Sequence, residues 1–531
     1  MCGIALLLGP SLDAADERRF DAMTSGIGQR GESIEEERTE GSLLVTSRLK
    51  IVDRELAVQP WNTGSGRHAL CYNGEVFNFR ELRETLVEEG TGFRSHSDTE
   101  VVAEALLAWG ERALLEFRGE FALAMVDHAD NSVFLARDPA GVKPLYWART
   151  PGRLYAASEI KALVGLGVRV HEVPPGHCGT GSPDRDPVLR PYIDLLDLGS
   201  DQPELGSVEA ATGAVRATLV EAVRRRVDTD LPVGIILSGG LDSSLVATVI
   251  ARLHPDCTAF TVGAPGSEDL DYARRLATDL GLRHVVVEVA PRRIRAAQVK
   301  EAVRVSEATE YGDVINAVVS MEVFAAVHRA GIKVVLTGDG SDELFGGYAM
   351  YRSVDEDRTR QLFLHKIRQL TRTELQRVDR TSMGQCVEAR VPFLDLDLLL
   401  LAMRIPVSFK VRDGYEKWIL REAFRDDLPD YILSRHKNPM SHSSGLHERV
   451  RLYKPLMPHW YRSFGYPVAG PMRRDFSVEL LRSGNDLARA VESAKLEQDY
   501  TPTERARDFA GAVQWNVRNA LQPGSSSRTT R

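Results

Sequence analysis

Short apolar runs alternate with longer segments of helical periodicity through the second half of the chain. Four of the runs have the length of buried strands, and they lie at 233–237, 258–262, 284–289 and 332–336. Apolar residues at helical spacing predict helices at 245–253, 271–280 and 312–328, with another that begins at Val208. This alternation indicates a parallel, doubly wound sheet, in which ligands bind at the carboxyl ends of the strands.

The first half has a different pattern. An apolar segment at residues 1–8 predicts a terminal strand, and Ser97 is placed to cap an apolar helix that runs to about Trp109. Residues 181 to about 208 are rich in Gly, Pro, Asp and Ser, which predicts a linker. We therefore expect domains at 2–185 and 208–520, with a polar, disordered tail at 521–531.

Length and composition support two domains of a soluble protein. A chain of 531 residues exceeds one ordinary domain, and 43% hydrophobic and 27% charged residues are typical of globular proteins. The formal net charge of −8 argues against a nucleic-acid partner. We find neither an apolar run long enough to span a membrane nor a secretory signal. Five scattered cysteines indicate a reducing, cytoplasmic location.

The stretch from Leu237 to Ser244, with the sequence LSGGLDSS, has the strongest chemical signal. It follows an apolar strand and precedes a helix, so backbone N–H groups and a helix N-terminus meet at one point, which suits an anion. Asp242 fits such a cradle only if a divalent cation bridges it to phosphates. The stretch differs from a Walker loop because no GK[ST] follows the glycines. It predicts a Mg²⁺–nucleotide site.

A second glycine-rich segment follows the last predicted strand. Residues 337–348 have the sequence TGDGSDELFGGY, in which acidic residues lie among four glycines. A solvated loop is the simpler interpretation. Because the first loop follows a neighbouring strand, we favour a role for this segment in binding the nucleotide and its metal ion.

These loops, together with VEARVPFLD at 387–395 and the basic residues at 417–421 and 435–437, resemble the synthetase domain of glutamine-hydrolysing asparagine synthetases over residues 210–450. The first loop alone resembles that of the ATP pyrophosphatase superfamily. The resemblance implies that ATP forms an acyl-adenylate on a carboxylic acid and releases pyrophosphate, with Mg²⁺ held by Asp242 and Asp342. Lys437 would stabilise charge at the reacting centre, Glu388 would be the general base toward ammonia, and Arg390 would order that loop. The residues implied in ATP binding are Leu237, Ser238, Gly239, Gly240, Asp242, Ser243, Ser244, Val262, Thr337 and Gly338.

Cys2 is notable because, if Met1 is removed, its amino group can act as the base for its own thiol. A lone cysteine is more often a small buried residue. Other fragments favour the interpretation of Cys2 as a nucleophile. Together with Cys2, they resemble the class II glutamine amidotransferase domain over residues 2 to about 180, and they lie near Arg48, Tyr72–Asn78, Asp98 and Arg137–Tyr146. That family implies an α+β, N-terminal-nucleophile αββα sandwich that hydrolyses glutamine.

The resemblance also implies roles for single residues. Cys2 would attack the glutamine carboxamide, while the Asn73 side chain and the Gly74 backbone N–H would form the oxyanion hole. Arg48 would bind the α-carboxylate of glutamine, and Asp98 with Glu75 would bind its α-ammonium. Ammonia would then cross the domain interface through an internal tunnel.

Two segments depart from the family pattern. Residues 28–33 are GQRGES where relatives have RHRGPD, so glutamine hydrolysis could be slow or tightly coupled. Relatives have the segment Thr-x-Arg-Ala-Ser-x-Pro-Met-Tyr where this chain has residues 314–322. The arginine of that segment, which is suited to bind a second carboxylate of the acceptor, is missing here. Aspartate is the favoured acceptor, and another small carboxylic acid stays open.

Two other functions are compatible with parts of the sequence. Intramolecular amide closure, as in β-lactam synthetase, would need no ammonia, and the intact set around Cys2 argues against it. A regulatory protein with idle sites is disfavoured because both sets of site residues are complete. The sequence leaves the oligomeric state open, with a homodimer as the assembly common among relatives.

Overall fold

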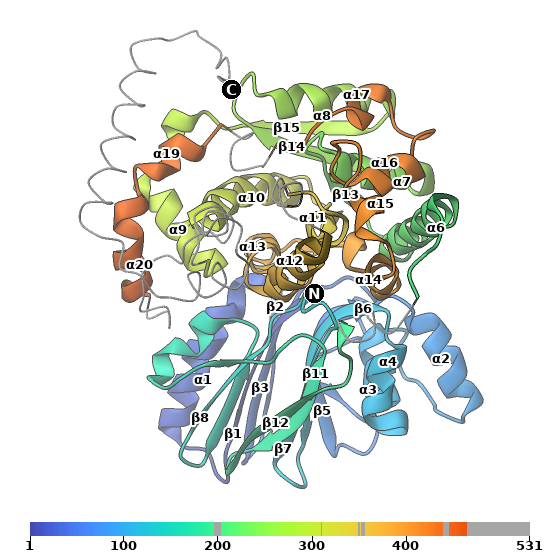
Figure 1. Cartoon of the computed structure of the whole chain (residues 1–531). Helices are drawn as coiled ribbons and strands as arrows, with labels where there is room; N and C mark the ends of the chain where they lie inside the picture. The colour runs from blue at the N-terminus through green and yellow to red at the C-terminus, as the bar shows by residue number, and fades with distance from the viewer. Residues whose placement is uncertain (196–202, 309–310, 349–350, 352–355, 439–444, 465–531) are drawn as a thin grey trace.

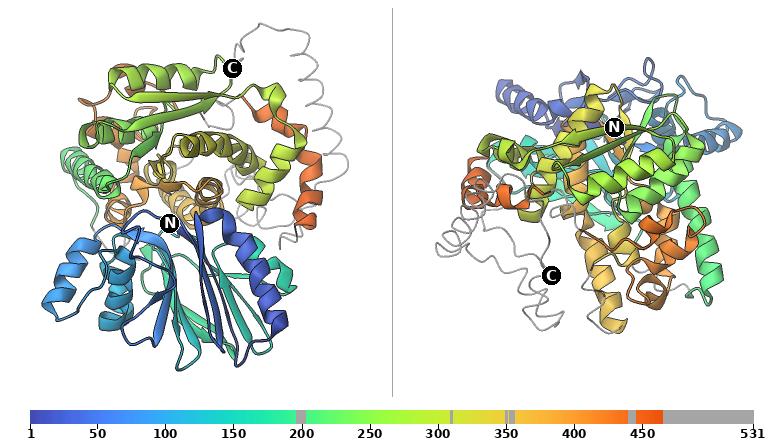
Figure 2. Two further views of the ribbon diagram at one scale, coloured as in Figure 1. Left: turned by 180° about the vertical axis from the view of Figure 1, so that it is seen from behind. Right: turned by 90° about the horizontal axis from the view of Figure 1, so that it is seen from above.

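The computed structural model describes residues 1–195, 203–308, 311–348, 351, 356–438 and 445–464. The chain forms two halves that meet along a broad interface, with the N-terminus between them (Figures 1 and 2). The predicted tail at 521–531 lies outside the described residues. Within the described residues, the structure has no helix that is long and apolar enough to cross a membrane.

The first half contains two six-stranded sheets that stack on each other, with α1 outside one sheet and α2 and α3 outside the other (Figure 1). The first sheet has the order β10-β8-β9-β1-β3-β2, and its strands are β1 (Cys2–Leu8), β2 (Ser33–Arg38), β3 (Ser42–Arg48), β8 (Tyr146–Thr150), β9 (Arg153–Ala157) and β10 (His171–Glu172). The second has the order β12-β11-β7-β6-β5-β4, formed by β4 (Trp61–Asn62), β5 (His68–Val76), β6 (Gly119–Asp127), β7 (Ser132–Arg137), β11 (His177–Ser182) and β12 (Arg185–Pro191). The helices here are α1 (Ala14–Ile27), α2 (Phe79–Glu88), α3 (Asp98–Trp109) and α4 (Ala113–Glu116).

Alternation along β1 explains the layering. Leu6 and Leu8 face the second sheet, whereas Ala5 and Leu7 pack against Phe20 and its neighbours on α1. All seven residues of β1 are therefore buried, which is expected for a strand covered on both faces. This arrangement confirms the predicted αββα sandwich. Ser97 caps α3 as predicted, since its side chain accepts the N–H of Glu100.

The predicted linker at 181–208 is wrong in its first part. Residues 185–191 form β12, which pairs antiparallel with β11 and extends the second sheet beyond the predicted boundary at residue 185. A linker was predicted here because the segment is rich in Gly, Pro, Asp and Ser, and proline usually interrupts strands. An edge strand tolerates proline, since one of its sides makes no ladder hydrogen bonds.

The second half is built on a parallel five-stranded sheet with the order β15-β14-β13-β16-β17. Its strands are β13 (Val233–Ile236), β14 (Thr258–Gly263), β15 (Arg283–Glu288), β16 (Val334–Leu336) and β17 (Glu388–Arg390). Helices surround it: α6 (Val208–Val227), α7 (Leu241–Leu253), α8 (Glu268–Asp279), α9 (Ala296–Ser306), α10 (Tyr311–Arg329), α11 (Ser341–Phe345), α12 (Glu356–Gln369), α13 (Glu374–Met383), α14 (Leu396–Met403), α15 (Val407–Lys410), α16 (Trp418–Ala423), α17 (Asp430–Leu433), α19 (His447–Arg451) and α20 (Met457–Ser463).

This sheet confirms the predicted α/β architecture. Val233 and Ile235 pack on one face with α6 and α7, whereas Phe260 and Val335 pack on the other face with α10. The four predicted strands and the helices between them are present within a few residues of the predicted bounds. The fifth strand, β17, was not predicted because three residues with two charged side chains carry no apolar run.

Buried ion pairs join the two halves. Arg226 of α6 binds Glu120 of β6 at 2.9 Å and Asp395 at 2.8 Å, and all three side chains are at most 2% exposed. Arg30 makes two hydrogen bonds to the Asp379 carboxylate of α13, at 2.8 and 3.0 Å. Because an unpaired buried charge costs several kcal/mol, these pairs fix the two halves in one relative position.

The amino-terminal edge of the parallel sheet faces the first half. Lys333, directly before β16, binds Glu32 at 2.8 Å, and Asp230, before β13, pairs with Arg54 at 2.9 Å. The carboxyl ends of the same strands therefore point away from the first half, as expected for parallel strands in one sheet.

We expect Arg226→Ala to lower the free energy of unfolding by about 3–5 kcal/mol, because Glu120 and Asp395 lose their closest cation while they stay buried. Arg224→Ala on the same helix is the matched control, since its pair with Glu221 is exposed and contributes less than about 1 kcal/mol. Denaturant unfolding measures both. Equal losses in the two variants would contradict the role given to the interface pairs.

Candidate active sites

The first site surrounds Cys2 at the start of β1. The Cys2 side chain is buried, and burial raises the pKa of its thiol, although the nearby N-terminal amine acts in the opposite direction. The backbone N–H of Cys2 donates to Oδ1 of Asn73 at 3.1 Å. A thiol in this setting is protonated at neutral pH and needs a base before it can act as a nucleophile.

Asn73 and Gly74 lie on β5, across from Cys2. Asn73 is fully buried, and its Nδ2 group has no hydrogen-bond partner in the described structure. Buried donors are seldom left unpaired, so this amide is available to a ligand. A Cβ atom at Gly74 would lie 2.3 Å from the Glu120 carbonyl oxygen, so only glycine fits between β5 and β6. The structure thus brings Asn73 into contact with the Cys2 backbone, with Gly74 next to it on β5.

Arg48 and Asp98 supply opposite charges near Cys2. Arg48 pairs with Cys2 across the β1–β3 ladder, and its guanidinium donates to the Asp53 carbonyl at 3.2 Å and to Glu35 at 3.4 Å. Asp98, the first residue of α3, accepts the N–H of Val76 at 3.3 Å. Burial raises the pKa of the Asp98 carboxyl to about 6. The site therefore offers a cation and a carboxylate to a zwitterionic ligand.

Glu388 lies next to this first site. Its carboxylate binds the Met1 amine at 2.7 Å and Arg390 at 2.6 Å, and Arg390 in turn pairs with Glu75. Burial opposes ionisation of Glu388, but the Met1 ammonium and Arg390 outweigh it and lower its pKa to about 2. Glu388 begins β17, so it lies at the amino-terminal edge of the parallel sheet, whereas the nucleotide loops follow the carboxyl ends of β13 and β16. Glu388 therefore lies at the opposite edge of the sheet from these loops, and its role as general base toward ammonia stays a prediction.

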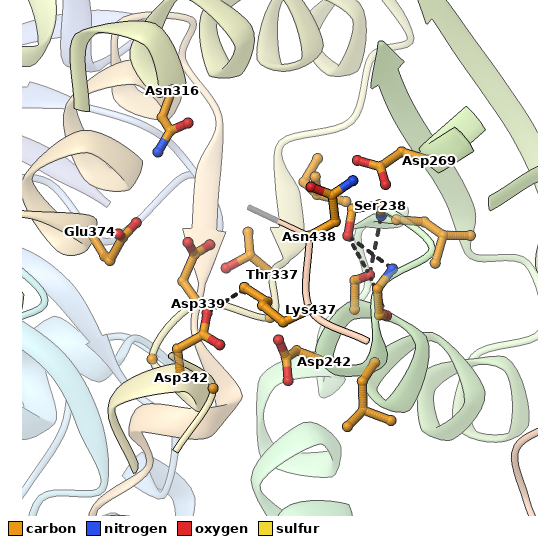
Figure 3. Close-up of a pocket in the computed structure, with 18 of the residues that line it drawn as sticks. Ser238, Asp242, Asp269, Asn316, Thr337, Asp339, Asp342, Glu374, Lys437 and Asn438 are labelled. Atoms are coloured by element: carbon orange, nitrogen blue, oxygen red, sulfur yellow. Dashed lines mark hydrogen bonds and ion pairs between the residues drawn. The ribbon is translucent and has the colours of Figure 1, made fainter. Parts of the chain in front are cut away.

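The second site is a cavity of about 340 Å³ at the carboxyl ends of β13 and β16 (Figure 3). One side is formed by the loop that starts at Ser238. Within this loop, the Ser238 N–H donates to Oγ of Ser243 at 3.1 Å, and Gly239 has a φ of 72° and backs onto Tyr272. A side chain at Gly239 would clash with the Tyr272 Cβ at 2.6 Å, which explains the glycine.

Two lysines hold the acidic residues at the centre of this cavity. Lys417 lies 2.5 Å from one carboxylate oxygen of Asp242 and 2.5 Å from one of Asp342, and Lys437 lies 2.6 Å from the other oxygen of Asp342. Burial opposes ionisation of Asp342, but Lys417 and Lys437 outweigh it and hold its pKa below the usual range. Lys417 was not assigned a role from the sequence, because a single lysine in a loop is usually solvated. Here it is 2% exposed.

The residues present fit a Mg²⁺ ion that arrives with phosphates. Asp242 and Asp342 both line the cavity, and a lysine cation already bridges them. Mg²⁺ prefers oxygen ligands and commonly takes one or two carboxylates together with substrate phosphates. Among the described residues, no group of three His, Cys, Asp or Glu side chains is arranged to hold a metal without such a ligand.

Most of the predicted nucleotide residues line this cavity. They are Leu237, Ser238, Gly240, Asp242, Ser243, Val262, Thr337, Gly338, Asp342 and Lys437. Gly239 and Ser244 lie in the same loop but behind the lining, Ser244 being fully buried in the first turn of α7. The cavity is also lined by Asn316, Ser320, Glu374 and Arg377, which were not expected from the sequence because nothing local relates α10 and α13 to the loops.

Comparisons with known proteins agree with these two sites. A family model for a glutamine amidotransferase domain matches residues 1–174, and one for asparagine synthase matches residues 214–360 and 352–498. The chain is 33% identical to asparagine synthetase (glutamine-hydrolyzing) 3 of Arabidopsis thaliana over 84% of this chain and 79% of that protein. It is also 33% identical to the putative asparagine synthetase (glutamine-hydrolyzing) 1 of Methanocaldococcus jannaschii, over 78% of this chain and 84% of that protein.

Proposed function

The chain belongs to the family of glutamine-hydrolysing asparagine synthetases, and from this premise we propose that it converts aspartate to asparagine with ATP and nitrogen from glutamine. The observation that carries the proposal is the position of Glu388, which begins β17 of the parallel sheet and lies next to the N-terminal residues of the chain. Through it, the sheet that holds the nucleotide loops reaches the buried thiol of the first half. A glutaminase and a synthetase in one rigid unit suit the transfer of ammonia between them.

Glutamine hydrolysis is assigned to the first site. Once Met1 is removed, the Cys2 amine takes the thiol proton, and the sulfur adds to the carboxamide carbon of glutamine. Asn73 Nδ2 and the Gly74 N–H stabilise the oxyanion, ammonia leaves, and water releases glutamate from the thioester. Arg48 binds the α-carboxylate, while Asp98 and Glu75 bind the α-ammonium. The unpaired Nδ2 of Asn73 supports this assignment.

Adenylation is assigned to the second site. ATP lies with its adenine near Leu237, Val262 and Gly338, and its phosphates lie along residues 238–244. A carboxylate oxygen of aspartate attacks the α-phosphorus, and pyrophosphate leaves. Lys417 and Lys437 are the cations that stabilise the charge developing on the phosphates. Asp242 and Asp342 would hold Mg²⁺, which would neutralise phosphate charge when bound.

Ammonia then attacks the acyl carbon of the adenylate, and AMP leaves with the acyl oxygen. A general base must lie within hydrogen-bond reach of the proton it removes. Asp339 lines the cavity and is partly exposed, so we assign this role to Asp339 in place of Glu388. Glu388, freed from the Met1 amine after processing, would face ammonia as it leaves the glutaminase site.

Two further properties belong to this proposal. The glutaminase domain would extend to the end of β12 at Pro191, since that strand completes its second sheet. A cytoplasmic location and a homodimer are expected from the sequence and the relatives' general properties. Closure of an internal amide without ammonia is not favoured, because the site around Cys2 is intact.

We expect the purified protein with ATP, Mg²⁺, glutamine and aspartate to form asparagine, glutamate, AMP and pyrophosphate in equal amounts. In Cys2→Ala, formation of asparagine from glutamine is lost, while formation from ammonium salts is retained, because the variant lacks only the nucleophile. Chromatographic amino-acid analysis and a pyrophosphate assay measure both. Cys71→Ala is the matched control, a buried cysteine on β5 with no assigned role.

An unchanged use of glutamine in Cys2→Ala would exclude Cys2 as the nucleophile. Glutamate release with no aspartate-stimulated pyrophosphate would retain the glutaminase and exclude aspartate as the acceptor.

We expect kcat/KM for glutamine to fall about tenfold per pH unit below a break near pH 6, because protonation of Asp98 removes the partner of the substrate ammonium. Asp98 has a raised pKa, so it is neutral below this pH and charged above it. In Asp98→Asn this break is absent, and kcat/KM is lower at neutral pH. The exposed Asp130→Asn is the control. A break near pH 6 that persists in Asp98→Asn would contradict the assignment.

A further inference from the structure

The end of the second cavity away from the Ser238 loop carries its own polar cluster. Asn316 of α10, Glu374 of α13 and Asp339 lie on one side of the cavity, and Ser238 and Asp269 lie on the other (Figure 3). The Ser238 side is assigned to the nucleotide. The opposite side is therefore the place for the acceptor acid.

Arg377 of α13 is the centre of this cluster. Its side chain is 5% exposed and donates to Ser320 Oγ at 3.0 Å, to Asp339 Oδ1 at 2.8 Å and to Glu374 Oε2 at 2.6 Å. All of these bonds use its two terminal nitrogens, and its Nε–H is buried without a partner. The amide oxygen of Asn316 is also without a partner. Buried polar atoms of this kind are normally satisfied, so a ligand is the natural source of the missing bonds.

The charges of the cluster fit a ligand that has both a cationic and an anionic group. One guanidinium faces two carboxylates, those of Asp339 and Glu374, which leaves one negative charge in excess. The lysines of the cavity are held at its centre by Asp242 and Asp342. The neighbouring wall is apolar, formed by Val319, Val323 and Phe324. A cationic group on the ligand compensates the excess charge, and the free Nε–H of Arg377 donates a hydrogen bond to an anionic group.

We propose that Arg377 and Glu374 recognise the acceptor as an α-amino acid. The Nε–H of Arg377 binds the α-carboxylate, and the carboxylate of Glu374 binds the α-ammonium, so the side-chain carboxyl is left to react at the phosphates. Arg377 thereby supplies the basic group that is missing from residues 314–322, where Ser320 instead hydrogen-bonds the Arg377 guanidinium. This inference rests on the proposed function, because it assumes that an acid is adenylated in this cavity.

Acceptors that lack one charged group test the two contacts separately. Pyrophosphate release is measured with ATP, Mg²⁺ and ammonium salts, using aspartate, succinate and β-alanine in turn. Succinate lacks the α-ammonium, and β-alanine lacks the α-carboxylate. In the unmodified protein, kcat/KM for aspartate exceeds that for either analogue by at least about tenfold, which corresponds to one charge-assisted hydrogen bond.

Each variant is expected to lose the preference for aspartate over one of the two analogues. Glu374→Gln lowers the preference for aspartate over succinate and keeps the preference over β-alanine. Arg377→Lys keeps the charge but loses the fork geometry, so it lowers the preference over β-alanine. In both, the KM for aspartate rises about tenfold or more, while the KM for ATP changes less than about twofold. Arg368→Lys and Glu301→Gln, exposed residues of α12 and α9, are the controls.

The outcomes separate the two proposals. If aspartate drives pyrophosphate release but both variants lower all three kcat/KM values equally, Arg377 and Glu374 are structural and the inference is overturned. An unmodified protein that accepts succinate as well as aspartate also overturns it. If no acid stimulates pyrophosphate release, the proposed function itself fails, and the inference fails with it. Should Arg377→Lys not fold, Glu374→Gln alone decides, because Glu374 is partly exposed and its replacement is isosteric.

Discussion

Buried charge between the two halves is the constraint on which the rest of the structure depends. Arg226 binds Glu120 and Arg30 binds Asp379, and both of these pairs cross the interface with almost no exposure to water, while Asp395 of the second half also binds Arg226. Such pairs are weak evidence for overall stability, but they are strongly directional, since a shift of either half would leave charges without partners. The interface therefore fixes geometry more than it adds free energy.

This fixed geometry places the two sites on opposite edges of one parallel sheet. Glu388, at the amino-terminal edge, meets the chain terminus beside Cys2, whereas the nucleotide loops follow the carboxyl ends of β13 and β16. Ammonia made at Cys2 would have to travel past this sheet to reach the cavity. Helix α13 spans the same path, because its Asp379 binds Arg30 near Cys2 and its Arg377 lines the cavity. Helix α13 thus lines the cavity directly and is linked to Cys2 through Arg30.

The sequence predicts those features of the fold and the sites that depend on residues close together in the chain. The loop at 237–244 follows an apolar strand, and Ser97 stands directly before an apolar helix, so spacing alone predicted both. Strand β12 was mistaken for a linker because its prolines are tolerated only at a sheet edge, which is a tertiary property. The positions of Lys417 and Arg377 in the cavity were missed because their partners lie far away in the chain: Lys417 is 175 residues from Asp242, and Arg377 is 57 residues from Ser320. The position of Glu388 in the sheet could be read only from the pairing of β16 with β17.

The central claim is that nitrogen passes from one site to the other inside the protein. The most direct test supplies glutamine labelled with ¹⁵N in its amide, together with ATP, Mg²⁺, aspartate and an excess of unlabelled ammonium, and measures the isotope in the asparagine amide by mass spectrometry. The account predicts that the product keeps the ¹⁵N of glutamine despite the unlabelled pool, because ammonia is sheltered from solvent. A product whose label follows the composition of free ammonium would contradict it.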